Sequence, residues 1–212
     1  MKLYTFFRSS AAFRVRIALN LKGLTYESLP RHFARNEHRT PEYLALNPQG
    51  LIPALAVDGV VLSQSLAIIE YLNDRHPEPA LLPDDPLDRA RVRSMALAIA
   101  CEIHPLNNLR VLNYLRNELG QDDQGVGTWY RHWVSEGFRG LEEQAREFSA
   151  SGRYCFGDSV SLADVYLVPQ MFNARRFKTD LAPFPTLAGI SAHLESLPAF
   201  AAARPEVQPD AQ

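Results

Sequence analysis

Two hydroxyl groups and a guanidinium lie next to one another near the start of the chain, in Arg8, Ser9 and Ser10. The residues before them predict a short strand and those after them predict a helix, so the three residues form the turn between two elements. The N-terminal end of a helix carries unpaired backbone N–H groups and a partial positive charge, which favour a bound anion. Serine is also a common helix N-cap. The spacing therefore leaves two interpretations open, an anion site and an ordinary cap.

Gln64 and Ser65 form a second polar pair, at the start of another predicted helix. A carboxylate there would meet side-chain donors, backbone N–H groups and the helix dipole together, although a plain cap explains the pair as well. Before them, Pro53 follows a glycine turn in NPQGLIPAL and begins a predicted strand. A proline that begins an edge strand can be cis and expose the backbone of its neighbour, but an ordinary strand start has the same sequence.

The elements that position these residues alternate between strand and helix in the first third of the chain. Asp58-Gly59 between two apolar runs is a strong signal for a two-residue hairpin turn. The order of elements, βαβαββα, is that of a thioredoxin-like domain. Strands are predicted at 2–6, 25–29, 52–57 and 60–62, and helices at 11–23, 41–46 and 65–75.

The first predicted helix interleaves apolar residues with Arg14, Arg16, Asn20 and Lys22. This period suits an amphipathic helix, and Gly23 is a typical residue to end it.

A change of composition separates this part from the rest of the chain. Residues 76–86, HPEPALLPDDP, contain four prolines in eleven residues and therefore predict a linker. Helical periodicity follows at 87–119, 128–149, 161–177 and 186–197, with a capping-box pattern from Ser161 to Asp164. We expect an α/β, thioredoxin-like N-terminal domain at 1–79 and an all-α C-terminal domain at 87–212. The tail after Arg204 has the composition of a disordered segment.

Composition and charge exclude several classes of protein. The chain has 212 residues, enough for two small domains, and its net charge of −2 argues against a general nucleic-acid binder. Neither a signal peptide nor an apolar run of about 18 residues is found, so no membrane partner is expected. Cys101 and Cys155 do not make a disulfide framework, which indicates a cytoplasmic protein.

The stretch FFRSSAAFRVRIALNLKG, from Phe6 to Gly23, resembles the strand-turn-helix signature of the zeta-class glutathione transferases. The usual pattern in that family reads close to FRSSCSWRVRIALALKG. Arg8 to Ser10 and Arg14 to Leu19 match it, whereas Ala11 replaces the usual cysteine. The resemblance covers nearly the whole chain and implies the glutathione transferase fold, glutathione as cofactor and a homodimer.

The resemblance also implies roles for particular residues. Pro53 is expected to be cis, so that the backbone of Ile52 pairs with the cysteinyl part of glutathione as an added strand would. Gln64 and Ser65 are expected to hold the γ-glutamyl end. The remaining positions that match glutathione contacts or face the family's active-site cleft are Ser9, Ser10, His38, Gln49, His104 and Asn108.

Three arginines carry the expected substrate chemistry. Arg110 matches a position that faces the cleft, and NARRFKTDL, which resembles the family's NAERFKVDL, places Arg176 on its substrate-binding arginine. If both converge with Arg8, the pocket suits a dicarboxylate, since guanidinium groups bind carboxylates bidentately. Separate solvated surface charges are the alternative. Many relatives lack the arginine at 110, which points to a shorter diacid such as maleylpyruvate.

With Ala11 in place of the cysteine, the nucleophile is expected to be the thiolate of glutathione, and no metal is required. Ser9 at the helix N-terminus would stabilise that thiolate, and Ser10 is the alternative contact. As the family mechanism implies, the thiolate adds to a cis double bond, the adduct rotates, and glutathione leaves the trans isomer. The sequence thus predicts an isomerase of maleylpyruvate or maleylacetoacetate in aromatic catabolism. A transferase that conjugates glutathione or dehalogenates small α-halo acids, and a non-catalytic interaction protein, are the alternatives.

Overall fold

The computed structural model describes residues 1–211, which form two compact units. The first unit combines residues 1–80 with the stretch from Ser196 onward, and the second unit is Leu81–Glu195. The expected division at 1–79 and 87–212 assigned the stretch from Ser196 to the helical domain, whereas its contacts group it with the first unit.

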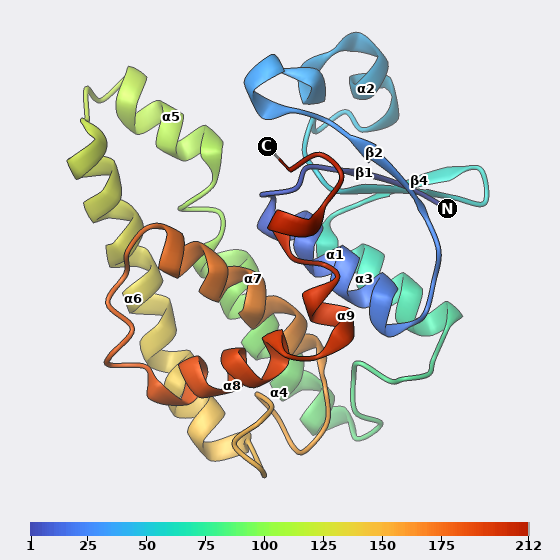
Figure 1. Ribbon diagram of the computed structural model, residues 1–212, viewed down its shortest axis with the longest axis vertical. Helices are drawn as coiled ribbons and strands as arrows, with labels where there is room; N and C mark the ends of the chain where they lie inside the picture. The colour runs from blue at the N-terminus through green and yellow to red at the C-terminus, as the bar shows by residue number, and fades with distance from the viewer. Residues whose placement is uncertain (212) are drawn as a thin grey trace. The chain divides into compact units, whose positions relative to one another are not determined.

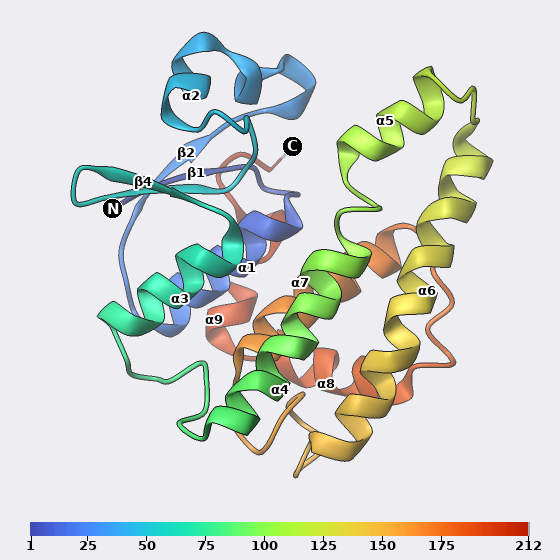
Figure 2. The same ribbon diagram turned by 180° about the vertical axis from the view of Figure 1, so that it is seen from behind.

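The first unit is built on a four-stranded mixed sheet with the order β2-β1-β3-β4. β1 runs parallel to β2, with Leu3 opposite Ser28, and antiparallel to β3, with Leu3 opposite Leu55. α1 and α3 cover one face of the sheet, and α2 lies on the other side (Figures 1 and 2). This arrangement confirms the thioredoxin-like prediction. The elements are β1 (Lys2–Thr5), α1 (Ser10–Leu21), β2 (Glu27–Pro30), the 3-10 turns η1 (Phe33–Arg35) and η2 (Glu37–Arg39), α2 (Pro41–Leu46), β3 (Ala54–Val57), β4 (Val60–Ser63) and α3 (Ser65–Arg75).

The β3–β4 hairpin turns at Asp58 and Gly59, both with positive φ (49° and 80°), as the sequence predicts. The strand that follows Pro53 is not an edge strand, because β3 pairs with β1 on one side and β4 on the other. Pro53 directly precedes this interior strand, where its missing N–H costs no ladder hydrogen bond.

Helix α1 was predicted to be amphipathic, but it is buried on nearly all sides. Every residue from Ser10 to Leu19 is buried, including Arg14 (2% exposed) and Arg16 (1% exposed). The helix packs against α3 and against α9 (Pro198–Ala201), so the face that carries its arginines is covered as well. The periodicity of apolar residues in the sequence cannot show that another element covers the polar face of a helix.

The stretch after Arg204 is ordered, so the prediction of disorder there is wrong. It contains the 3-10 turn η4 (Pro205–Val207), and Gln208 Nε2 donates to the carbonyl oxygens of Ala202 (3.0 Å) and Arg204 (2.8 Å). Asp210 is only 8% exposed. Composition fails here because a polar segment can still have buried hydrogen-bond partners on the surface of a packed domain.

The second unit is helical, as predicted for this part of the chain. The stretch with helical periodicity at 87–119 contains a π-helical segment and then a turn that begins after Ile103, next to Pro105, where a proline is expected to interrupt a helix. α6 buries a stripe that includes Val126, Tyr130, Val134 and Phe138, spaced by four residues. The elements are α4 (Pro86–Leu97), the π-helix η3 (Ala98–Ile103), α5 (Leu109–Asn117), α6 (Asp123–Phe148), α7 (Leu162–Arg176) and α8 (Pro185–Glu195).

The start of α7 is fixed by the predicted capping box. The buried carboxylate of Asp164 accepts hydrogen bonds from the Ser161 N–H and the Ser161 hydroxyl, both at 2.8 Å, and from the Cys155 N–H at 2.7 Å. None of the helices within residues 1–211 combines the length and apolarity that crossing a bilayer requires.

Candidate active site

The β1–α1 turn presents Ser9 as the N-cap of α1. Its Oγ accepts the Ala12 N–H at 3.2 Å, which shows that the cap interpretation is correct as far as it goes. Because Oγ acts as the acceptor in that bond, the hydroxyl proton can still be donated to an anion at the helix N-terminus. Ser10 is the first helical residue and only 6% exposed. The cap and the anion site are therefore compatible, and Ser9 is the more accessible of the two hydroxyls.

Arg8 is exposed beside this turn. Its guanidinium lies over the ring of Phe7, 5.0 Å from the centroid, and 5.8 Å from the centroid of Phe6. A cation on aromatic faces at the surface keeps its charge available for a carboxylate.

The Ile52–Pro53 peptide bond is cis, as the family resemblance implies. The loop before it is anchored through one carbonyl oxygen, that of Leu51, which accepts from Tyr43 Oη (2.7 Å) and Asn47 Nδ2 (2.8 Å). Within residues 1–211, the N–H and C=O of Ile52 take part in no backbone hydrogen bond. These two groups are what an added peptide strand would pair with.

Gln64 and Ser65 form the N-terminal end of α3, in an unusual conformation. Gln64 has φ 69° and ψ 119°, and α3 has no side-chain cap at this position. A non-glycine residue held at positive φ is uncommon and is often found at functional sites. Gln64 Nε2 donates to Gln49 Oε1 at 2.9 Å, so two residues predicted to contact glutathione lie together. Ser65 Oγ accepts from Arg14 Nη1 at 3.4 Å, a contact that joins α3 to α1.

His38 is half-buried in η2, with its ring against Phe33 (4.7 Å between centroids) and its Nδ1 buried. Burial lowers the pKa of His38, and the neighbouring charge of Arg39 acts in the same direction. A neutral imidazole can donate one hydrogen bond to a carboxylate and leave the other nitrogen as an acceptor.

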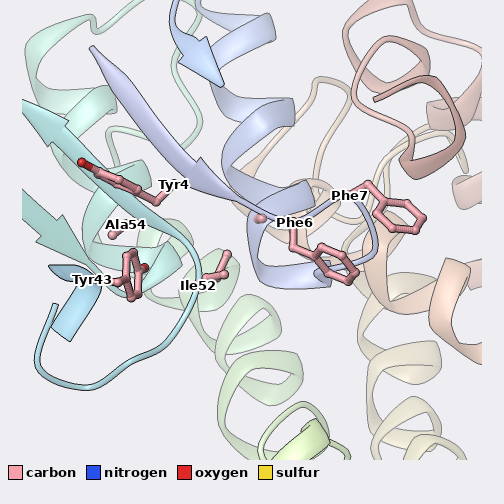
Figure 3. Close-up of a cluster of buried hydrophobic side chains, with 7 residues drawn as sticks. Tyr4, Phe6, Phe7, Tyr43, Ile52 and Ala54 are labelled. Carbon is pink, nitrogen blue, oxygen red and sulfur yellow. The ribbon is translucent and has the colours of Figure 1, made fainter. Parts of the chain in front are cut away.

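A cluster of buried apolar side chains fixes the β1–α1 turn relative to the cis-proline loop. Figure 3 shows Phe6 and Phe7 at the end of β1 and Ile52 on the loop before β3. Phe6 and Phe7 meet edge to face with 4.8 Å between ring centroids. This close packing of apolar side chains joins the two loops. The cluster consists of Tyr4, Phe6, Phe7, Ala12, Tyr43, Ile52 and Ala54.

In the helical unit, His104 ends the π-helix η3 and Asn108 caps α5. Asn108 Oδ1 accepts the Arg110 N–H at 3.1 Å, so the cap uses the side-chain oxygen. Arg110 is exposed in the first turn of α5. A cation is unfavourable next to the positive end of a helix, and a bound carboxylate would relieve that repulsion.

Arg176 is the last residue of α7, and its guanidinium lies 5.0 Å from the ring centroid of Phe177. Phe177 stacks on Tyr130, and the Tyr130 carbonyl accepts from Asn107 Nδ2 at 3.3 Å. The segments that carry Arg110 and Arg176 thus meet at Tyr130 of α6. Sequence reasoning missed this link, since an Asn and a Tyr in separate helical segments carry no motif. Arg8 belongs to the other unit, and its approach to these two arginines stays a prediction.

Neither cysteine lies in the β1–α1 turn. Cys101 is exposed in η3, and Cys155 is 2% exposed. Burial, followed by the charge of Asp164, raises the pKa of the Cys155 thiol well above its ordinary value. The arrangement around the turn therefore suits an external thiolate.

Comparisons with known proteins give one consistent result. The family model "Glutathione S-transferase, N-terminal domain" matches residues 1–74. A "Probable maleylacetoacetate isomerase" of Vibrio cholerae is 52% identical over 211 residues, which cover 99% of this chain and 97% of that protein.

Two solved structures extend this likeness to the whole fold. One is described as the holo structure of maleyl pyruvate isomerase, a bacterial glutathione S-transferase in the zeta class; its TM-score is 0.98, with 48% identity and all of both chains covered. Another is maleylacetoacetate isomerase from Methylobacterium extorquens AM1 with bound malonate and GSH, with a TM-score of 0.95, 41% identity and all of both chains covered.

Proposed function

The chain belongs to the zeta class of the glutathione transferase family, and on that premise we propose that it is a glutathione-dependent cis-trans isomerase of maleylpyruvate or maleylacetoacetate. The observation that carries the proposal is a set of polar groups in the first unit that can each still make a hydrogen bond to a ligand. They are the Ile52 backbone, the α3 end at Gln64 without a side-chain cap and the Ser9 hydroxyl, and they lie on loops that one apolar cluster fixes. Full-length relatives at 41–52% identity named for this reaction support the assignment.

The residues of the first unit fit glutathione from end to end. The N-terminus of α3, with Gln64 and Ser65, takes the γ-glutamyl carboxylate, because backbone N–H groups and the helix dipole favour an anion there. The backbone of Ile52 pairs with the cysteinyl residue in the manner of an added strand. Gln49 and His38 provide further polar contacts, and Ser9 lies at the N-terminus of α1 to meet the sulfur.

The chain's own residues then direct the chemistry. When bound, glutathione supplies a thiolate that adds to the substrate's cis double bond and leaves again once the resulting single bond has rotated. Ser9 and the α1 dipole stabilise the thiolate before addition and after release. Arg8, together with Arg110 or Arg176, holds the two carboxylates and stabilises the enolate charge that develops during addition. His104 and Asn108 complete the contacts from the helical unit.

The presence of Arg110 in the first turn of α5 favours the shorter diacid, maleylpyruvate. A second cation for one carboxylate holds the substrate more tightly, and one CH₂ changes where the far carboxylate lies. Discrimination between substrates that differ by one methylene is about 10- to 200-fold at best, so we expect activity on both with a preference for maleylpyruvate.

A spectrophotometric assay of both diacids, with and without glutathione and with parallel titration of free thiol, tests the function. The expected result is glutathione-dependent formation of the fumaryl product at constant thiol. Thiol loss with a stable adduct would instead identify a transferase or dehalogenase. Turnover of neither diacid, despite glutathione binding, would refute the isomerase proposal and favour a non-catalytic role.

Arg110 offers a matched pair of variants, since Arg116 lies on the same helix, is exposed, and pairs with Asp123 at 3.2 Å. Loss of a charge-assisted bidentate contact costs about 2–3 kcal/mol, so Arg110→Ala should lower kcat/KM for maleylpyruvate about 30- to 160-fold. Arg116→Ala should leave it unchanged. Equal effects of the two variants would show that only the net charge of α5 matters.

The family further implies a homodimer with separate glutathione-binding and substrate-binding domains. The two free cysteines favour a cytoplasmic, reducing compartment. Light scattering of the purified protein tests the dimer: a monomer mass at micromolar concentration, with full activity, would refute it.

A further inference from the structure

Phe7 lies between β1, which ends at Thr5, and the residues Arg8 and Ser9, and side chains from other segments bind both of its backbone polar groups. Its N–H donates to Asp210 Oδ2 at 2.9 Å, and its C=O accepts from Arg16 Nη2 at 2.9 Å. The Phe7–Asp210 bond spans 203 positions in the sequence, yet all of these residues belong to the first unit. Side chains from outside the turn therefore bind the backbone of Phe7.

Arg16, which binds the Phe7 carbonyl, also contacts several other groups. Besides Phe7, its guanidinium donates to Thr5 Oγ1 (3.1 Å) and the Phe6 carbonyl (3.4 Å), and its Nε donates to the Ala203 carbonyl (3.1 Å). Burial lowers the pKa of Arg16 to about 10, while the charges of Tyr26 and Asp210 act to raise it. The side chain thus stays charged at neutral pH and joins the end of β1 to the stretch that follows α9.

Asp210 makes the corresponding contact on the N–H side, where its carboxylate accepts one hydrogen bond, from the Phe7 N–H. It is 8% exposed, and among residues 1–211 its Oδ1 has no hydrogen-bond partner. The segment that presents it is held at other points, since Asn20 Nδ2 donates to the Ala199 carbonyl at 2.9 Å and Ala211 packs against the apolar cluster. The carboxylate of Asp210 is thus held in place, and the residue whose N–H it binds, Phe7, is two residues before Ser9.

We propose that Asp210, through its hydrogen bond to the Phe7 N–H, is a positioning residue for the Arg8–Ser9 turn and so for the ionisation of bound glutathione. Arg16 donates to the C=O of the same residue, which belongs to the next peptide unit. The inference rests on the proposed function, because it assumes that the Ser9 hydroxyl meets the glutathione sulfur. Without the Asp210 acceptor, the buried Phe7 N–H has to seek another partner, and the turn moves with it.

Three variants test the proposal in the full-length protein. Asp210→Ala removes the acceptor, Asp210→Asn keeps the shape and one acceptor oxygen, and Glu206→Gln removes an exposed carboxylate from the same segment as a control. A displacement of 1 Å at a reacting group can cost about 100-fold in rate, so a partial shift in Asp210→Ala should lower kcat about 10-fold. The pKa of the bound glutathione thiol should rise by about one unit. Asp210→Asn should restore most of both, and Glu206→Gln should match the wild type.

The thiol titration separates this role from a merely structural one. Asp210→Ala with a lower melting temperature but unchanged thiol pKa and kcat would overturn the proposal, as would an Asp210→Asn variant no better than Asp210→Ala. If Asp210→Ala does not fold, Asp210→Glu decides: it keeps the charge but moves the acceptor by one methylene, and an unchanged thiol pKa would overturn the proposal. Wild-type protein that ionises bound glutathione without isomerising either diacid would refute the proposed function alone, since the titration needs no diacid.

Discussion

Replacing Ser9 with alanine tests whether the α1 N-terminus does more than cap a helix. The change removes the hydrogen bond from the Ala12 N–H to Ser9 Oγ, 3.2 Å in length, and should lower the free energy of unfolding by about 1 kcal/mol. It also removes the hydroxyl proton that would stabilise the bound thiolate. A hydrogen bond to a charged group contributes about 1.5–3 kcal/mol, which corresponds to about one to two pKa units. The thiol pKa should therefore rise by that amount, and kcat near neutral pH should fall about 10- to 100-fold.

The assay is a pH titration of the ultraviolet absorbance of the thiolate in the glutathione complex, beside the pH dependence of kcat. Ser9→Thr keeps both the cap and the hydroxyl, and should stay close to the wild type in both measurements. Ser10→Ala alters the buried neighbour, and should leave the thiol pKa in place. If Ser9→Ala loses stability while the thiol pKa does not move, Ser9 is only a cap. If Ser10→Ala raises the thiol pKa instead, the sulfur contact is assigned to the wrong serine.

Three further outcomes follow from the structure. Asp164→Ala leaves the N–H groups of Ser161 and Cys155 without their acceptor, so chemical denaturation should show a loss of about 3–4 kcal/mol; a loss below 1 kcal/mol would contradict the buried capping box. A thiol reagent should modify exposed Cys101 and leave buried Cys155 intact in the native protein. Adding the small methylthio group to Cys101 should keep the isomerase activity within about twofold of the unmodified protein, because the nucleophile is glutathione. Since the folded-state pKa of His38 lies below its unfolded value, the unfolded chain binds the proton first, and stability should fall as pH drops below about 6.5. His38→Asn should flatten that part of the plot of melting temperature against pH. An equal slope in the variant and the wild type would refute this contribution of His38.

Local patterns predict the first unit well where a short-range signal exists. Proline at the first position and a threonine cap mark α2 at Pro41–Leu46, and Asp58-Gly59 marks the hairpin. The capping box at Ser161 is another signal of this kind, and the structure has it as predicted. These features depend on residues within one turn of one another.

Features that depend on long-range packing were not predictable in the same way. Arg16 has the spacing of a solvent-facing side chain, yet the stretch after α9 covers it and supplies the Ala203 carbonyl as a partner. Asp210 lies in a tail whose composition favours disorder, and only the position of the Phe7 N–H gives it a buried role. The same applies to Gln64, whose positive φ comes from the junction of β4 with α3 and not from any preference of glutamine.

For the candidate site, the residues came from family resemblance, while the structure adds how they are held. Gln49 and Gln64 share a hydrogen bond, and Ile52 lies in the same cluster as Phe7. Tyr130, which joins the segments of Arg110 and Arg176, carries no sequence signal of its own.

The discontinuity of the first unit affects how the protein is made. The helical unit, Leu81–Glu195, is in topological terms an insertion between two parts of one fold. During synthesis at about 5–20 residues per second, the first 80 residues leave the ribosome roughly ten seconds before their closing segment does. Until then Arg16 lacks the Ala203 carbonyl and Phe7 lacks Asp210, so both groups are left without their final protein partners. A nascent chain should therefore be able to form its sheet before the backbone of Phe7 has its final hydrogen bonds.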